Sequence, residues 1–74
     1  GDNPPMSEQE AVEYMLTMAP YGDDLREWAL KDPHRCLFEV VQMFNLLPTN
    51  GGVFLPVLLI TAYQMWRMKQ RGKT

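Results

Sequence analysis

The spacing of hydrophobic residues between prolines and glycines predicts helices along most of the chain. Hydrophobic residues recur at intervals of three and four, which is the period of one face of an α-helix. Pro20–Gly22, Pro33 and Pro48–Gly52 interrupt this pattern. The β-branched run that begins at Val57 has no second strand to pair with, so no sheet is expected. The pattern therefore predicts an all-α protein, a small bundle of three to four short helices at about 7–19, 23–31, 33–47 and 53–70.

Residues suited to helix N-termini precede three of these segments. Ser7 and Glu10 have the spacing of a capping box, in which hydroxyl and carboxylate each accept a backbone N–H from the other residue. Asp23 or Asp24 is expected to cap the second helix, and Asp32, followed by proline, the third. The residues predicted to face inward are Ala11, Val12, Met15, Leu16 and Ala19 in the first helix, Leu25, Trp28 and Ala29 in the second, and Cys36, Leu37, Val40, Val41, Phe44 and Leu47 in the third.

The last segment, at about 53–70, has no polar face across its first three turns. A helix that is apolar all round is either buried or in contact with lipid. Its main apolar run, the eleven residues from Val53 to Tyr63, is too short to cross a bilayer, because a span takes about 20 residues. Three short helices would leave much of this segment exposed. We therefore expect self-association, as a two-fold dimer in which these helices pack together, or cover by a partner protein.

Large apolar side chains suggest where such an interface lies. Six methionines in 74 residues is a high content, and flexible thioether chains suit both irregular cores and adaptable binding surfaces. Several of these residues lie off the predicted inward faces or on the last helix, although ordinary core packing explains them as well. The candidate interaction residues are Tyr14, Met18, Phe38, Met43, Phe54, Leu58, Met65 and Trp66.

Charge is distributed unevenly along the chain. Residues 1–32 carry eight acidic and two basic side chains, a net charge of −6, whereas residues 33–74 carry one acidic and five basic, a net charge of +4. This polarity matches the helix macrodipole, and it would also steer an anionic partner toward the C-terminal end. The basic tail at that end consists of Arg67, Lys69, Arg71 and Lys73.

Length and composition limit the number of domains, and the cysteine content indicates the cellular compartment. A hydrophobic content of 46% and a charged content of 22% are typical of a folded chain, and 74 residues allow a single domain, expected at 7–74. Residues 1–6 are expected to be a disordered N-terminal segment or a non-native remnant. The single Cys36 excludes a disulfide within one chain and suits the cytoplasm, and no secretory signal pattern opens the sequence.

Residues able to support catalysis or metal binding are few. Ser7 is explained by capping, and Cys36 lies on an apolar stripe, where an inert buried thiol is the ordinary outcome. His34 is two positions away, so the two side chains point to different sides of a helix. The acidic group at Asp23, Asp24 and Glu27 is explained by capping and solvation. We expect no enzyme activity, cofactor or metal site.

Three functional hypotheses follow, in order of preference. The first is a small non-enzymatic helical interaction module or subunit. It would self-associate through its C-terminal helix and dock on or regulate a larger protein. The second is a peripheral membrane protein that uses Val53–Trp66 and the basic tail, without spanning the bilayer. The third is a small DNA-binding regulator, which the acidic pI of 5.2 disfavours.

Overall fold

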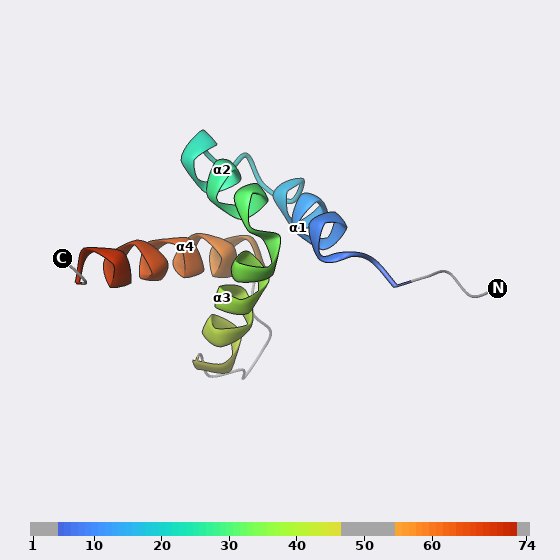
Figure 1. The fold of residues 1–74 in the computed structure, drawn as a ribbon. Helices are drawn as coiled ribbons and strands as arrows, with labels where there is room; N and C mark the ends of the chain where they lie inside the picture. The colour runs from blue at the N-terminus through green and yellow to red at the C-terminus, as the bar shows by residue number, and fades with distance from the viewer. Residues whose placement is uncertain (1–4, 47–54, 73–74) are drawn as a thin grey trace.

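The computed structural model describes residues 5–46 and 55–72 of the chain, and in these residues it contains helices and no strands (Figure 1). The all-α prediction is confirmed. The helices are α1 (Glu8–Leu16), α2 (Asp23–Lys31), α3 (Pro33–Leu46) and α4 (Leu55–Arg71). The expectations for residues 1–4, for Leu47, Val53 and Phe54, and for Lys73 fall outside the described residues.

Helix α1 begins as predicted and ends earlier than predicted. The Glu10 N–H donates to Ser7 Oγ and the Ser7 N–H donates to Glu10 Oε1, both at 3.1 Å, which completes the capping box. The hydrogen bond that the Glu10 carboxyl accepts from the Ser7 N–H is the main cause that lowers the pKa of this exposed carboxyl. The helix ends at Leu16 and not near residue 19, because Thr17 turns back on it: its N–H and its hydroxyl both donate to the Tyr14 carbonyl, at 3.0 and 2.6 Å.

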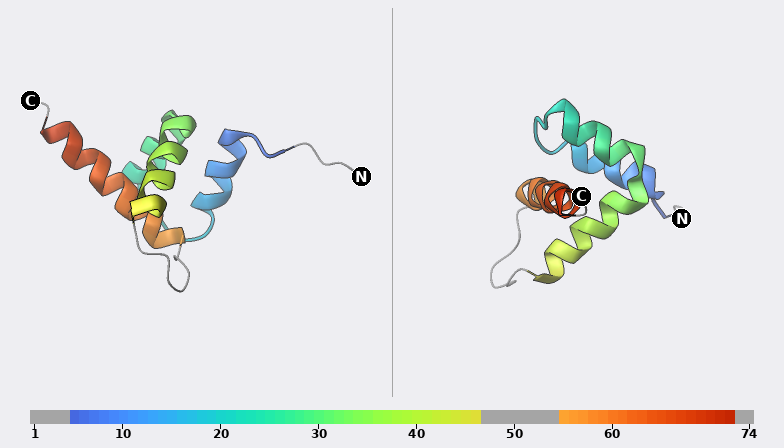
Figure 2. Two further views of the ribbon diagram at one scale, coloured as in Figure 1. Left: turned by 90° about the horizontal axis from the view of Figure 1, so that it is seen from below. Right: turned by 60° about the vertical axis from the view of Figure 1, so that its left-hand side comes forward.

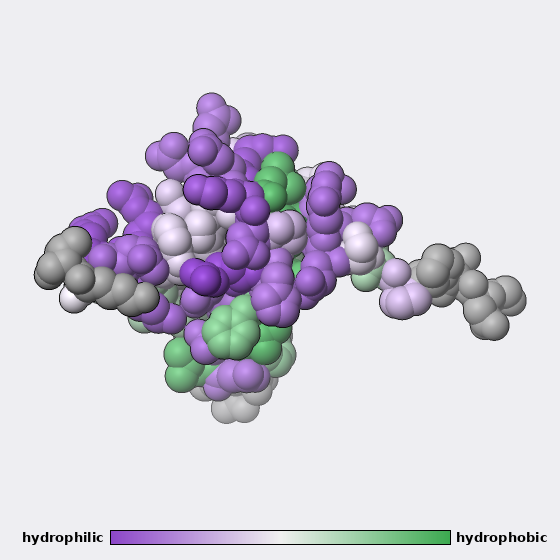
Figure 3. Space-filling model, in the orientation of Figure 1, coloured by the Kyte–Doolittle hydropathy of each residue, from purple (hydrophilic) through white to green (hydrophobic). Residues whose placement is uncertain are grey.

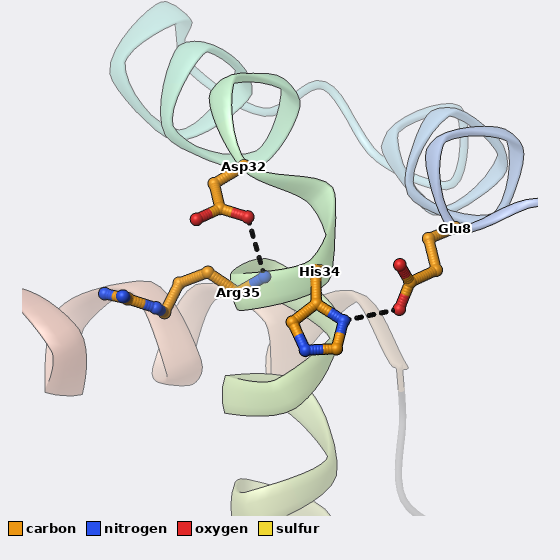
Figure 4. A network of polar contacts seen from close by, with 4 residues as sticks. All are labelled: Glu8, Asp32, His34 and Arg35. Carbon is orange, nitrogen blue, oxygen red and sulfur yellow. Dashed lines mark hydrogen bonds and ion pairs between the residues drawn. The ribbon is translucent and has the colours of Figure 1, made fainter.

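The N-termini of α2 and α3 are capped differently. Gly22 is the N-cap of α2 and no side chain caps it, so the expectation that Asp23 or Asp24 would do so is wrong. Both aspartates lie in the first turn, where a negative charge still favours the helix dipole. Asp32 caps α3 as predicted: its carboxylate accepts the Arg35 N–H at 3.1 Å (Figure 4).

Helix α3 is the centre of the fold. It packs against each of the other three helices, most extensively against α4. It crosses α4 at a steep angle in Figure 1, and Figure 2 (left) shows it between α4 and α1. The core that these contacts enclose consists of Val12, Met15, Leu16, Leu25, Ala29, Cys36, Val40, Met43, Leu58, Leu59 and Ala62.

The inward side of α3 differs from the predicted one. Val41 and Phe44 are exposed, whereas Glu39 and Met43 are buried. The reason is the position of α4, whose Lys69 ammonium donates to Glu39 Oε2 at 3.1 Å and so compensates the buried carboxylate. The apolar residues of α3 cover more than one face, so the sequence pattern allowed two orientations of this helix. The structure has the orientation in which Glu39 pairs with Lys69.

Helix α4 is covered on one side only. Pro56, Leu58, Leu59 and Ala62 are buried, and Pro56 lies in the first turn, where its missing N–H costs no helix bond. The Pro56 carbonyl accepts a hydrogen bond from the Tyr21 hydroxyl at 3.2 Å. This bond connects the segment before α2 to the start of α4. None of the described helices has both the length and the hydrophobicity that crossing a membrane requires.

Candidate interaction surface

An exposed row of large apolar side chains runs along the side of α3 that faces away from the core. Phe38, Val41 and Phe44 are 54%, 55% and 47% exposed, and Leu46 at the end of the helix is 72% exposed. Their spacing of three residues puts the first three along one side of the helix. We call Phe38, Val41 and Phe44 the outer ridge of α3. Figure 3 shows hydrophobic residues gathered over the lower part of α3, while most of the remaining visible surface is hydrophilic.

The outer ridge carries no charge. Within residues 36–46 the one charged side chain is Glu39, which is 6% exposed and points into the contact with α4. Single exposed apolar residues are ordinary on protein surfaces, whereas contiguous apolar patches larger than a few hundred Å² are uncommon on monomers. Sequence reasoning placed Val41 and Phe44 in the core and so missed this ridge.

A second set of apolar side chains lies on the uncovered side of α4. Val57, Ile60 and Met68 are exposed there. Ile60 also lines a hollow of about 440 Å³ between α4 and the segment that joins α1 to α2. We call Val57, Ile60 and Met68 the outer face of α4. It is more polar than the outer ridge of α3, because exposed Gln64 and Arg67 lie between its apolar residues.

The structure separates the predicted interaction residues into three groups. Tyr14 and Met18, like Phe38, are exposed. Met43 and Leu58 belong to the chain's own core, and Met65 and Trp66 are partly buried, with Met65 packed against that core. Phe54 lies outside the described residues. Of the predicted interaction residues that the structure describes, Phe38 is the one that lies on the outer ridge of α3.

Aromatic side chains meet between α2 and α4. The ring centroid of Trp28 is 5.1 Å from that of Tyr63 and 5.8 Å from that of Trp66, in tilted packing. Beside them is a shallow cavity of about 250 Å³, whose rim includes Asp24, Glu27 and Lys31. Trp28 packs against the other two rings, and all three rings also line this cavity. The mixed charges of the rim favour neither an anion nor a cation.

The basic tail is partly engaged within the chain. The Arg67 guanidinium lies over the Tyr63 ring, 5.6 Å from its centroid. Lys69 donates to Glu39 at 3.1 Å and to Gln42 Oε1 at 3.5 Å. Arg71 also takes part in an interaction, and Lys73 lies outside the described residues. At least two of the four cations therefore have contacts within the chain, and the Lys69 side chain is still about half exposed.

A polar contact anchors α1 to the first turn of α3. His34 Nδ1 lies 2.7 Å from Glu8 Oε2, and both side chains are exposed (Figure 4). The hydrogen bond to the carboxylate is the main cause that raises the pKa of His34. The imidazole is therefore held by α1, close to the N-terminal end of the outer ridge.

The cysteine and the histidine do not form a reactive pair. Cys36 is fully buried, and this burial raises the pKa of its thiol to about 11, whereas His34 is exposed and bonded to Glu8. A thiol of that pKa stays protonated at neutral pH and is a poor nucleophile. Among residues 5–46 and 55–72, no three His, Cys, Asp or Glu side chains come together as metal ligands would.

Comparison of the chain with protein families, with characterised proteins and with solved structures found no significant match.

Proposed function

We propose that this chain is a non-enzymatic helical interaction module, which associates with a second copy of itself and docks on or regulates a larger protein. The observation that carries the proposal is the outer ridge of α3, in which Phe38, Val41 and Phe44 are uncharged and each about half exposed. Leaving such a row in water forgoes the hydrophobic free energy that its burial would release.

The size of the protein supports the same proposal. A domain of 74 residues buries a small core and is marginally stable on its own, with roughly 60% of its unfolded surface removed from water. Association adds buried apolar surface to such a fold. The outer face of α4, in the helix through which the sequence predicted a dimer, is a second surface for association. The proposal includes a cytoplasmic location, because a reducing compartment suits the single thiol, Cys36.

The test is the solution mass of the protein by light scattering, over a hundredfold range of concentration and without detergent. We expect the mass to rise above the 8.6 kDa of one chain as the concentration increases. The double variant Phe38→Gln/Phe44→Gln should stay monomeric, since glutamine keeps the helix and removes the rings. Tyr14→Gln, at another exposed aromatic position, is the matched control and should associate like the wild type. A wild-type chain that is folded and monomeric throughout would overturn the proposal.

A peripheral membrane role is the second candidate, and the outer face of α4 is the observation that favours it. Val57 and Ile60 lie toward the start of this face, and Arg67 and Lys69 follow at its basic end. An interfacial helix combines an apolar side with cations that meet anionic lipid. Co-sedimentation with vesicles rich in phosphatidylserine tests it. Absence of binding at low salt would exclude this role, while the interaction proposal would be unaffected.

A further inference from the structure

Three hollows between α2 and α4 adjoin one another and form a single groove. The first, of about 440 Å³, shares Asp24 and Tyr63 with the second, of about 250 Å³. The second shares Trp28, Lys31 and Trp66 with the third, of about 260 Å³. We call this continuous depression the α2–α4 groove.

One end of the α2–α4 groove is mainly apolar. The first hollow lies beside the segment that joins α1 to α2, and its lining includes Pro20, Leu25 and Ile60. Asp24 is the one charged residue among the described residues that line it. Its volume falls within the range of ligand pockets, about 300–1,000 Å³. An apolar side chain of a partner is therefore the fitting occupant of this end.

The charges that line the groove change sign along it. Asp24, Glu27 and Lys31 lie on one side of α2, with Lys31 about 10 Å beyond Asp24 along the helix. Arg35, in the first turn of α3, lines the third hollow. Asp32 lines it too, but its carboxylate already accepts the Arg35 N–H as the cap of α3. The groove therefore runs from acidic side chains to basic ones.

The charged side chains on the α2 side of the groove are available to a partner. Within residues 5–46 and 55–72, neither Asp24 nor Glu27 nor Lys31 takes part in an ion pair, and all three are exposed. The Arg67 guanidinium lies over the Tyr63 ring but lines none of the three hollows. A single ion would meet both signs in this groove, whereas a molecule with both charges in the complementary order would be attracted at each end.

An extended peptide has the dimensions that this order requires. Its alternate side chains point the same way and lie about 6.6 Å apart, so the first and fifth positions are about 13 Å apart. An apolar side chain at the first position fits the first hollow. A lysine or arginine at the third meets Asp24, Glu27 and the Trp28 ring, which a cation also favours. An acid at the fifth meets Lys31 and Arg35.

We propose that the α2–α4 groove binds an extended segment of a partner protein whose alternate residues are apolar, basic and acidic, in that order along the groove. The proposal rests on the docking part of the proposed function and names the chemistry of the segment that docks. It does not use the outer ridge of α3 or self-association.

Tryptophan fluorescence of the full chain tests the proposal. Both tryptophans of the chain, Trp28 and Trp66, line the groove, so their emission reports its occupancy. The probe is acetyl-Leu-Ser-Lys-Ser-Glu-amide, which has no aromatic group. The comparison peptide is acetyl-Leu-Ser-Glu-Ser-Lys-amide, which has the same composition and the two charges exchanged. We expect a saturable change in emission at millimolar probe, and binding of the comparison peptide that is weaker by about five-fold or more.

A charge exchange in the protein is the matching measurement. The double variant Glu27→Lys/Lys31→Glu alters two exposed positions and should reverse the preference, so that it binds the comparison peptide more tightly than the probe. A reversed preference cannot come from a folding defect. Glu13→Lys, at an exposed acid of α1 outside the groove, is the matched control and should keep the wild-type preference.

The possible results separate this proposal from the proposed function. No saturable change with the probe, equal affinity for the two peptides, or a wild-type preference that the double variant keeps would each overturn the groove proposal. The self-association measured by light scattering would be unaffected by any of these results. A wild-type chain that stays monomeric but prefers the probe would overturn self-association and leave the groove proposal standing.

Discussion

The two sides of α3 show that hydrophobicity alone does not decide which residues a small helical protein buries. Its inner side buries a carboxylate, that of Glu39, while its outer ridge leaves the rings of Phe38 and Phe44 about half exposed. By composition the ridge is the better candidate for a core. The side that is buried is the one on which α4 packs and on which Lys69 supplies a partner for the acid.

The contrast implies different energetics for the two sides. On the inner side, close packing sets the cost of a change, because a deleted group leaves a cavity that the neighbours fill only in part. On the outer ridge a deleted group leaves water, so the isolated chain loses little. The ridge becomes costly to alter only when a second molecule covers it.

The largest expected effect compares two adjacent residues, one from each side. Met43→Ala should lower the free energy of unfolding by about 2–5 kcal/mol, because Met43 is buried in the core. Phe44→Ala removes a larger side chain but should cost less than about 1 kcal/mol at concentrations where the chain is monomeric. Urea unfolding at low micromolar concentration measures both. A larger loss from Phe44→Ala would show that the outer ridge packs within one chain.

The ion pair between α3 and α4 gives the next largest effect, and it should be asymmetric. Lys69→Met leaves the Glu39 carboxylate buried without a partner, and we expect a loss of about 1–3 kcal/mol. Glu39→Met leaves an ammonium that is about half exposed and that water can solvate, so this variant should unfold within about 1 kcal/mol of the wild type. Urea unfolding of both variants measures the difference. Equal losses would mean that packing, and not the buried charge, dominates this contact.

The contact between His34 and Glu8 should give a smaller effect that depends on pH. The folded-state pKa of His34 is raised above its ordinary 6.5, so the contact stabilises the fold fully below the unfolded-state pKa and ceases to do so as the pH rises through the raised value. His34 is the one histidine of the chain, so its ring protons titrate alone in a proton NMR spectrum. Glu8→Gln should lower the measured pKa, and Glu13→Gln should leave it unchanged. No difference between the two variants would exclude the contact in solution.

Local sequence signals predicted the helices well. The capping box of Ser7 and Glu10 and the cap at Asp32 are short-range features, and the structure contains both. The early end of α1 was missed because Thr17 hydrogen-bonds back to the Tyr14 carbonyl, which competes with continuation of the helix.

The orientation of α3 and the candidate site could not be predicted in the same way. Val41 and Phe44 fit a helical stripe as well as Val40 and Met43 do, so periodicity could not choose between them. The buried Glu39 is matched by a lysine 30 positions further along the chain. A contact of that separation exists only once the helices have packed, so neither the buried acid nor the exposed ridge could be deduced from local pattern.

The smallest expected effect concerns a second polar group on the inside of the molecule. The Trp66 Nε1–H is buried, and no acceptor among the described residues lies within hydrogen-bond distance of it. Trp66→Phe loses some ring contact with Trp28 and also removes a donor whose burial without a partner costs about 1–3 kcal/mol. These contributions oppose each other, so the free energy of unfolding should stay within about 1 kcal/mol of the wild type.

Tyr21→Phe is the matched deletion of a donor that does have a partner, since the Tyr21 hydroxyl donates to the Pro56 carbonyl at 3.2 Å. It should cost about 0.5–1.5 kcal/mol with almost no change in ring packing. Thermal and urea unfolding of the two variants side by side measure the difference. A loss above about 2 kcal/mol from Trp66→Phe, with none from Tyr21→Phe, would show that the indole N–H is paired in solution. The Trp66 indole would then have a partner, as the buried Glu39 carboxylate does. Pairing of buried polar side-chain atoms would then hold throughout the described part of the chain.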